Sequence, residues 1–276
     1  MLGPAAAKAR ETSLWNPVLS VKRWLYGSKQ LVCAPLKISV IIPAFNEESL
    51  LAGCLKSVNE ACLAFAPLGW VSEVIVCDNN STDRTAEIAR EAGATVVFEA
   101  INQISRARNR GAAAAGGDWL VFVDADSYPS AELFGDLAHT IQSGKCFGGG
   151  ANVVFDGRIN GAKYWVGAWN LLSRTFRWAA GSFVFCERAT FVELGGFSAE
   201  LFASEEIEFS RRLKRLARRQ GKRVVILRRY PLLTSSRKLR LYSAGELRRF
   251  FLRATLRPGK VLRDRDACAL WYDGRR

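Results

Sequence analysis

The feature that most constrains the fold of this chain is a repeated order of segments between residues 37 and 126. A short run of apolar residues is followed each time by a polar loop and then by a stretch with helical character. Strands are expected at 38–42, 74–77, 94–98 and 118–126, and helices at 46–62, 83–92 and 105–117. Strands that alternate with helices form a mostly parallel sheet with helices on both faces. The sequence therefore predicts an α/β fold.

Segments with polar residues stand at the ends of three of the expected strands. They are Pro43–Glu47, Asp78–Asn79 and Asp124–Asp126. In open α/β sheets, ligands bind in the crevice at the carboxyl ends of the strands. We therefore expect these three segments to converge on one binding crevice. Asn46 is also expected to cap the first helix.

Asp124 and Asp126 are separated by one small residue, Ala125, at the end of an apolar run. Residues i and i+2 of a strand face the same side, so the two carboxylates are expected to point together. Two carboxylates in a partly buried crevice repel each other unless a cation joins them. Mg²⁺ binds few carboxylates and completes its shell with phosphate oxygens, which predicts a nucleotide diphosphate as the ligand. The alternative is a solvated turn with two surface aspartates.

Several classes of protein are disfavoured by the sequence. The seven cysteines form no C-x-x-C pair and His139 is the single histidine, so neither a zinc site nor a Ser–His nucleophile is expected. Neither G-x-G-x-x-G nor G-x-x-x-x-G-K-[ST] occurs, which disfavours a dinucleotide oxidoreductase and a P-loop enzyme. No apolar run reaches the ~18 residues that span a bilayer, and the first residues lack the order of a signal peptide. A cytoplasmic protein is expected.

Five segments together resemble glycosyltransferase family 2, whose members have the GT-A fold. They are ISVIIPAFNEE, EVIVCDNNSTDRTAEIA, ARNRGAAAAGGDWLVFVDADS, GSFVFCERATFVELGGF and ASEEIEFSRRLKR, in unbroken order within residues 37–230. The resemblance implies a Rossmann-like nucleotide-diphospho-sugar transferase fold. It also implies transfer of a sugar, with inversion, from a UDP- or GDP-type nucleotide sugar to an acceptor hydroxyl or a lipid-linked phosphate. The implied cofactor is a divalent cation, Mg²⁺ or Mn²⁺.

The same resemblance implies roles for individual residues. The residues that match the nucleotide-binding segments are Pro43, Ala44, Asn46, Glu47, Asp78, Asn79, Arg106, Asp124, Ala125 and Asp126. The first four belong to the first nucleotide-binding loop, and Asp78 matches the aspartate that contacts the base. The segment from Asp124 to Asp126 matches the D-x-D motif, which holds the ribose, the pyrophosphate and the metal. Arg106 lies in the family's basic stretch near the nucleotide, and a solvated helix face is the alternative for it.

A catalytic base is also implied. Inverting transfer is a single displacement, so the acceptor hydroxyl must lose its proton as it attacks, which requires a carboxylate within reach. Family members usually carry Glu-Asp where this chain has Glu205-Glu206. Glu206 is expected to be the base, with Glu205 as the alternate. Both acids are also compatible with the first turn of a helix, where the helix dipole favours them. Gly181-Ser182 stands where relatives bring the backbone close to the acceptor.

The predicted organisation has three parts. They are an N-terminal arm (1–35), a GT-A domain (36–230) made of a nucleotide-binding half (36–126) and an acceptor half (127–230), and a basic C-terminal tail (231–276). One alternative function is a sugar-1-phosphate nucleotidyltransferase, which shares the fold but carries a glycine-rich basic loop that PAFNEESLLAG lacks. The other is a non-enzymatic nucleic-acid-binding or scaffold protein, which has no need of four acids at Asp78, Asp124, Asp126 and Glu206.

The positive charge of the chain is concentrated at one end. Residues 211–276 hold 22 Lys and Arg against 4 Asp and Glu, whereas residues 1–210 hold 18 against 22. A uniformly basic nucleic-acid binder is not expected to show this distribution, and no nucleic-acid partner is predicted. On a helix over 237–265, Leu247, Phe250, Phe251 and Ala254 fall on one side, flanked by Arg248, Arg249, Arg253 and Arg257. This pattern predicts peripheral association with an anionic membrane, on its inner face, and packing on the core is the alternative.

Overall fold

The computed structural model describes residues 35–157, 162–179 and 181–237, followed by residues 241, 245–246, 249, 252–253, 257–268 and 272. The chain divides into two units, residues 1–34 and residues 35–276, and every described residue belongs to the second. The predicted N-terminal arm (1–35) therefore lies outside the described residues, apart from Pro35. Part of the predicted amphipathic helix at 237–265 also lies outside them.

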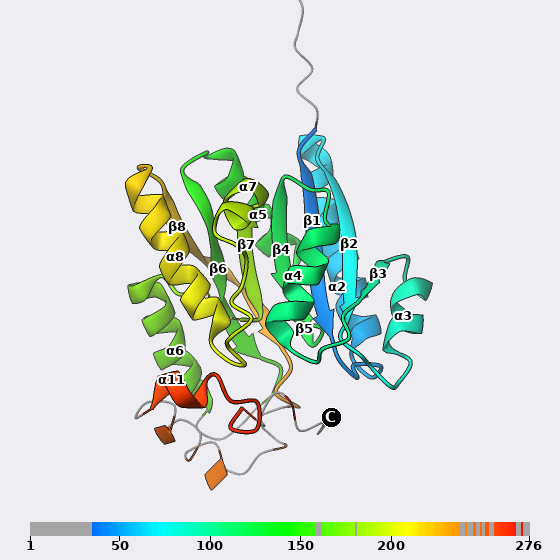
Figure 1. Cartoon of the computed structure of the whole chain (residues 1–276). Coiled ribbons are helices and arrows are strands. Elements are labelled where there is room, and N and C mark those ends of the chain that lie inside the picture. Colours follow the sequence, from blue (N-terminus) through cyan, green and yellow to red (C-terminus); the bar gives the residue numbers. More distant parts are fainter. Residues whose placement is uncertain are drawn as a thin grey trace, which may run out of the picture. The chain divides into compact units, whose positions relative to one another are not determined.

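The described strands form one eight-stranded sheet (Figure 1). Their order across the sheet is β3-β2-β1-β4-β7-β6-β8-β5. In chain order they are β1 (Lys37–Ala44), β2 (Val71–Asp78), β3 (Thr95–Phe98), β4 (Trp119–Val123), β5 (Ser127–Tyr128), β6 (Cys146–Phe155), β7 (Phe183–Glu187) and β8 (Arg223–Thr234).

Helices follow most of the strands, as the repeated segment order predicts. They are α2 (Leu51–Cys62), the 3₁₀ helix η1 (Leu63–Leu68), α3 (Thr85–Glu91), α4 (Ile104–Ala114), α5 (Ala131–Gln142), α6 (Ala162–Phe176), α7 (Arg188–Glu193), α8 (Glu205–Arg219) and α11 (Pro258–Val261). The helix after β1 begins later than expected, because Asn46 has a positive φ of 51° and helix α2 starts only at Leu51. Asn46 is therefore not the cap of this helix, and the cap prediction was wrong.

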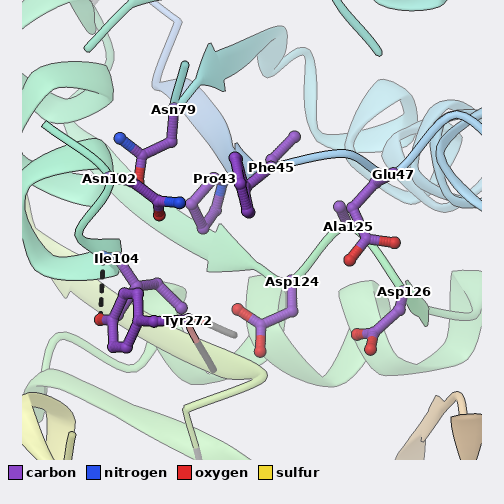
Figure 2. Close-up of a pocket in the computed structure, with 11 residues that line it drawn as sticks. Pro43, Phe45, Glu47, Asn79, Asn102, Ile104, Asp124, Ala125, Asp126 and Tyr272 are labelled. Carbon is purple, nitrogen blue, oxygen red and sulfur yellow. Dashed lines mark hydrogen bonds between the residues drawn. The ribbon is translucent and has the colours of Figure 1, made fainter. Parts of the chain in front are cut away.

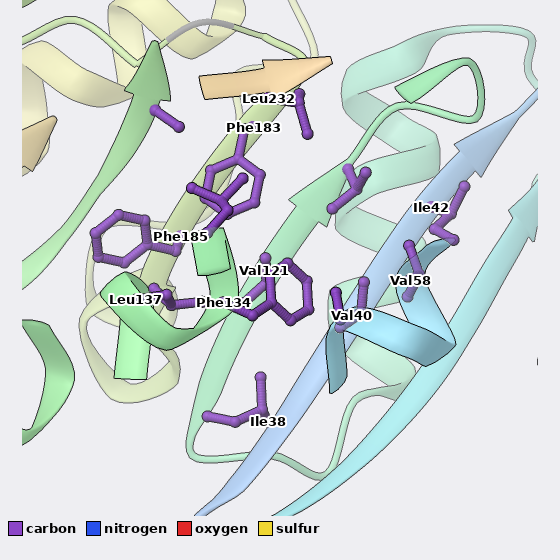
Figure 3. Packing of buried hydrophobic residues seen from close by; sticks show 14 of the residues in the cluster. Ile38, Val40, Ile42, Val58, Val121, Phe134, Leu137, Phe183, Phe185 and Leu232 are labelled. Atoms are coloured by element: carbon purple, nitrogen blue, oxygen red, sulfur yellow. The ribbon is translucent and has the colours of Figure 1, made fainter. Parts of the chain in front are cut away.

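The sheet buries apolar side chains on both faces. Along β1, Ile38, Val40 and Ile42 pack into one cluster, with side chains of α2 and α5 (Figure 3). Ile41 points to the other face, where a second cluster includes side chains of α7 and α8. A strand buried on both faces has no polar alternation, and this explains the continuous apolar run in the sequence. Each fully buried Ile or Val contributes about 1.5–3 kcal/mol of transfer free energy.

The direction of the strands changes in the middle of the sheet. β1 pairs in parallel with β2 and with β4, and β2 with β3, whereas β7 runs antiparallel to both of its neighbours, β4 and β6. Val123, the last residue of β4, is paired with Phe183, the first residue of β7. The start of β7 therefore lies beside the edge where β1, β2 and β4 end. The fold is the mixed but mostly parallel α/β sheet with helices on both faces that the sequence predicts.

Strand β6 occupies a glycine-rich stretch in which the sequence indicated no strand. A Cβ atom added to Gly149 would lie 1.7 Å from the carbonyl oxygen of Val225 in β8. A side chain at this position is therefore incompatible with the pairing of β6 and β8. Glycine is unfavourable in strands in general, but here the close approach of two backbones requires it.

The predicted end of the GT-A domain at residue 230 falls inside β8. This strand continues to Thr234, and Leu232 is completely buried and paired with Val153 of β6. The boundary is therefore corrected, because a buried strand of the central sheet cannot belong to a separate tail.

Candidate active site

A pocket lies at the carboxyl ends of β1, β2 and β4, where the sequence places its polar segments (Figure 2). The residues that line it are Pro43, Ala44, Phe45, Glu47, Asn79, Asn102, Ile104, Asp124, Ala125, Asp126 and Tyr272. Seven of these, Pro43, Ala44, Glu47, Asn79, Asp124, Ala125 and Asp126, were candidate binding residues in the sequence. The expected convergence of three segments on one crevice is present in the structure.

The loops after β1 and β2 hold each other in place. Asn46 accepts a hydrogen bond through Oδ1 from the backbone N–H of Thr82 (2.8 Å), and its own N–H donates to Ser81 Oγ (3.0 Å). The N–H of Glu47 donates to Thr85 Oγ1 (2.8 Å). Asn46 does not line the pocket, and its side chain is used to join the two loops. Its left-handed backbone is the conformation that Asn tolerates better than most residues.

The candidate base-binding residues Asp78 and Asn79 differ in position. Asp78 is buried and accepts a hydrogen bond from the N–H of Ser81 (3.0 Å), and it does not line the pocket. Asn79 lines it and also fixes the loop after β3, because its amide donates to the carbonyl of Ile101 (2.6 Å) and accepts from the N–H of Gln103 (2.9 Å). Arg106 is outside the pocket lining, and its Nε donates to Gln103 Oε1 (3.0 Å).

The D-x-D segment forms a turn. Strand β4 ends at Val123, and the N–H of Ser127 donates to the carbonyl of Asp124 (3.0 Å). The strand alternation used to predict that both carboxylates point together therefore does not apply here. Asp124 and Asp126 nevertheless both line the pocket, and Figure 2 shows their carboxylates next to each other. The turn therefore places both carboxylates at the pocket, as was expected of a strand.

The chemistry of these two carboxylates fits a hard divalent cation. Within the described residues, no group of three or more His, Cys, Asp or Glu side chains is arranged to hold a metal ion. Mg²⁺ and similar cations in nucleotide sites use one or two carboxylates and take their other ligands from phosphate oxygens and water. Asp124 and Asp126 match that smaller requirement.

Arg108 of α4 is a functional candidate that sequence reasoning missed. Its side chain is 1% exposed and makes two ion pairs, from Nη2 to Asp124 Oδ1 (2.9 Å) and from Nη1 to Glu205 Oε1 (2.7 Å). Nη2 also donates to the carbonyl of Gly181 (2.7 Å). One guanidinium thus joins the D-x-D turn, the start of α8 and the segment before β7. A guanidinium suits this task because its donors form a rigid planar fork.

The two glutamates at the start of α8 differ in their surroundings. Glu205 is 2% exposed and its carboxylate is held by Arg108, so it is not free to approach an acceptor. Glu206 is less buried, and a Cβ atom added to Gly181 would lie 3.5 Å from its carboxyl group. Burial, together with the charge of Glu205, raises the pKa of Glu206 to about 8. A raised pKa and partial exposure are properties that general bases often have.

The last part of the chain supplies one wall of the pocket. The hydroxyl of Tyr272 accepts a hydrogen bond from the N–H of Ile104 (3.3 Å), and its ring packs edge-on against Phe202. Cys268 is buried in the same small cluster, and the N–H of Phe202 donates to the carbonyl of Leu262 (2.7 Å). These described residues of the predicted tail pack on the domain. Arg237 also reaches the site, since its guanidinium pairs with Glu47 (2.5 Å).

Comparison with known proteins agrees with this architecture. The model of the family described as glycosyl transferase family 2 matches residues 39–193. Glucosyl-3-phosphoglycerate synthase of Mycobacterium tuberculosis is 35% identical over 121 residues, which are 40% of this chain and 35% of that protein. The chain spans about a third of the length of the curated relatives it matches.

Two solved structures have the same fold. The mannosyltransferase PcManGT from Pyrobaculum calidifontis, in complex with GDP-Man and Mn²⁺, has a TM-score of 0.59 at 21% identity, covering 84% of this chain and 67% of that one. Glucosyl-3-phosphoglycerate synthase from M. tuberculosis, in complex with Mn²⁺, UDP and phosphoglyceric acid, has a TM-score of 0.55 at 23% identity, covering 80% and 78%. At these identities the likeness establishes the GT-A fold and confirms that prediction.

Proposed function

We propose a donor, a cofactor and a base on the premise that the chain belongs to glycosyltransferase family 2, whose model matches more than half of its residues. The proposed reaction is the metal-dependent transfer of a sugar from a UDP or GDP sugar to an acceptor hydroxyl or a lipid-linked phosphate, with inversion. Family membership favours this function over the nucleotidyltransferase and the non-enzymatic alternatives. The observation that carries the proposal is the Arg108 network, which joins the D-x-D turn to the helix that bears Glu206.

The proposed donor site is the pocket itself. The nucleoside would lie against the loops after β1 and β2, with Asn79 as a hydrogen-bonding partner, because bases and riboses are bound by polar side chains on loops. Asp124 and Asp126 would hold Mg²⁺ or Mn²⁺. A cation there would neutralise the charge that develops on the leaving diphosphate. PcManGT and the mycobacterial synthase, which share the fold, are described with Mn²⁺ and GDP-Man or UDP.

The proposed base is Glu206. It lies at the first turn of α8, next to Gly181, and Gly181 is bound through its carbonyl to the same guanidinium that holds Asp124. An acceptor between Gly181 and the D-x-D turn would be close both to the departing diphosphate and to the carboxylate that takes its proton. Glu205 is proposed to position this carboxylate and not to exchange protons with the acceptor.

The proposal is tested first by donor binding. Thermal shift measurements with UDP and with GDP, each with and without Mn²⁺, should show stabilisation by at least one nucleotide that increases with the cation. The variant Asp126→Asn should lose the increase that depends on Mn²⁺. Asp136→Asn, a partly exposed aspartate of α5, is the matched control and should behave as the parent. No stabilisation by either nucleotide would overturn the donor assignment.

The proposal is tested second by turnover. Many transferases slowly hydrolyse their own donor, so a set of UDP and GDP sugars should reveal the sugar by release of UDP or GDP. Glu206→Gln keeps the shape of the side chain and removes the base. It should bind nucleotide normally and slow transfer by about two to four orders of magnitude. An unchanged transfer rate would remove Glu206 from this role.

The location of the protein remains a proposal. We propose a cytoplasmic protein that associates peripherally with the inner face of a membrane, as the basic C-terminal sequence suggests. Of the residues that define the predicted amphipathic pattern, Arg249, Arg253 and Arg257 are described, and all three are exposed. Leu247, Phe250, Phe251, Ala254 and Arg248 lie outside the described residues.

A further inference from the structure

Helix α6 exposes large apolar side chains near its carboxyl end. Leu171 is 60% exposed, Leu172 44% and Phe176 44%. Leu172 and Phe176 are four residues apart and therefore lie on the same side of the helix, with Leu171 next to them. Single exposed apolar residues are common on protein surfaces, but three within two helical turns form a patch. In the described part of the chain, no helix is long and apolar enough to cross a bilayer.

Basic side chains adjoin this patch. Residues 211–230 contain ten Lys and Arg and no Asp or Glu, so the basic excess of the chain begins inside the domain and not only in its tail. On helix α8, Arg211, Lys214 and Arg218 recur at intervals of three and four and share one side. Arg211 and Arg218 are exposed, as is Arg177 at the end of α6.

The two sets meet where the end of α6 contacts the middle of α8 (Figure 1). Lys214 Nζ donates a hydrogen bond to the carbonyl of Phe176 (2.9 Å), and the guanidinium of Arg211 lies 5.2 Å from the ring centre of Trp178. The pKa of Lys214 is lowered by partial burial and by three neighbouring guanidinium groups, those of Arg218, Arg177 and Arg211. Crowding of like charges is unfavourable, and a bound polyanion would relieve it.

We propose that this surface, the α6–α8 surface, docks on an anionic lipid bilayer. Leu171, Leu172 and Phe176 enter the region between headgroups and acyl chains, while Arg177, Arg211, Lys214 and Arg218 contact lipid phosphates. An exposed apolar side next to a basic side is the arrangement of interfacial helices that bind anionic membranes. A nucleic acid would use the basic side but would leave the aliphatic side chains in water, so the combination favours lipid.

This docking would place the candidate active site close to the membrane. Glu206 and Arg211 lie five residues apart on α8, which corresponds to about 8 Å along the helix axis. The segment that leads from α6 to Gly181 is also tied to α8, since the N–H of Ala179 donates to Ser210 Oγ (3.1 Å). An acceptor anchored in the bilayer would therefore present its polar end within reach of the proposed base. This inference rests on the peripheral membrane association proposed above. Vesicle binding needs no turnover, so its failure can be distinguished from failure of the proposed transfer reaction.

The test is co-sedimentation of the full chain with vesicles of phosphatidylcholine alone and of phosphatidylcholine mixed with phosphatidylglycerol, at low and high salt. We expect binding to the anionic vesicles that weakens with salt, because exposed charges are screened. The double variant Arg211→Gln/Arg218→Gln should bind about 30-fold more weakly, since each basic residue near an anionic surface accounts for about a fivefold change. Leu172→Ser/Phe176→Ser should also bind more weakly, and its loss should persist at high salt.

Matched controls keep the test specific. Leu63→Ser, at a position 70% exposed on η1, and Arg90→Gln, at an exposed position on α3, make the same chemical changes elsewhere and should bind as the parent. Arg249→Gln/Arg253→Gln tests the tail separately. The proposal is overturned if the parent does not bind, or if only the tail variant loses binding. Binding of the same variants to RNA is measured in parallel. The proposal is also overturned if Arg211→Gln/Arg218→Gln weakens binding to RNA while Leu172→Ser/Phe176→Ser leaves binding to vesicles unchanged.

Discussion

Replacing Arg108 by Met should destabilise the domain, and the size of the effect follows from the burial of its partners. Met has a similar length and removes the charge without creating a large cavity. Glu205, at 2% exposure, would then lose its guanidinium and remain in the interior. The smallest loss of stability results if Glu205 takes up a proton. Protonation lowers the free energy of unfolding by about 1.4 kcal/mol for each pH unit above the ordinary glutamate pKa of 4.5.

At about pH 7 this response costs about 3 kcal/mol. Burial raises the pKa of Glu205 even with Arg108 in place, so part of this cost is already present in the parent protein. The cost of about 3 kcal/mol is therefore an upper limit for the contribution of Glu205. Asp124 adds less, because its side chain is 20% exposed and water still reaches it. We expect a total loss of about 3 kcal/mol in the free energy of unfolding, near the lower end of the range of ~3–5 kcal/mol found when a buried ion pair loses one partner.

The loss of stability in Arg108→Met should depend on pH in a definite direction. In Arg108→Met the pKa of Glu205 is higher in the folded state than in the unfolded state, so the unfolded state binds fewer protons and stability falls as pH rises above about 4.5. The loss relative to the parent should therefore shrink to about 1 kcal/mol at about pH 5.5. Urea unfolding at both pH values measures it. The double variant Arg108→Met/Glu205→Gln should recover stability at the higher pH and lose the pH dependence.

Arg110→Met is the matched control, since Arg110 is exposed on the same helix and should change the free energy of unfolding by less than ~0.5 kcal/mol. A loss below about 1 kcal/mol for Arg108→Met at neutral pH would refute the reasoning, because broken buried pairs cost more than this. A loss that is equal at both pH values would refute the specific account based on Glu205.

Three further outcomes are expected. Because the pKa of Glu206 is raised to about 8 by burial and by Glu205, the transfer rate at saturating substrates should rise with pH and level off above about 8. A transfer rate that does not change with pH, over the range in which the protein stays folded, would contradict the role of Glu206 as the base. Excess EDTA should abolish donor turnover, and Mn²⁺ or Mg²⁺ should restore it, as measured by nucleotide release; full activity in EDTA would show that no cation is needed. Gly181→Ala places a methyl group 3.5 Å from the carboxyl of Glu206, which is an ordinary contact, and the φ of Gly181 is not in the left-handed region. The melting temperature should therefore stay the same or rise, while transfer slows by about ten- to a hundredfold. An unchanged transfer rate would mean that the acceptor does not pass this position.

The parallel half of the fold could be predicted because its signal is local. Each strand from β1 to β4 is a short apolar run, and each is followed by a polar loop at the edge where ligands bind. This is why Pro43, Asn79 and Asp126 were found from the sequence before their positions were known. The turn at 124–126 was misassigned as strand, but the conclusion held because the turn also presents both carboxylates to the pocket.

The second half carried less local signal. Strand β6 was missed because three consecutive glycines indicate a loop in isolation, and only the approach of β8 explains them. Arg108 was missed because a charged residue in an arginine-rich helix normally faces water, and its partners are 16 and 97 residues away. Tyr272 was missed for the same reason, since its hydrogen bond to Ile104 spans 168 residues. Contacts of this length leave no periodicity in a single sequence.

The reversal of strand direction at β7 has a consequence for how such a protein could be diversified. The D-x-D turn lies at an edge of the sheet where β1, β2 and β4 end, whereas β7 starts at the same edge and runs in the opposite direction. The segment before β7 is attached to this edge, because the N–H of Asp124 donates to the carbonyl of Ser182 (3.3 Å). On the proposed function, insertions or exchanges between β6 and β7 would therefore alter the acceptor side of the site without changing the register of the strands on the donor side. If the proposed function holds, the specificity for the acceptor could be varied separately from that for the donor, and a grafted segment would have to preserve its junction at Gly181–Phe183.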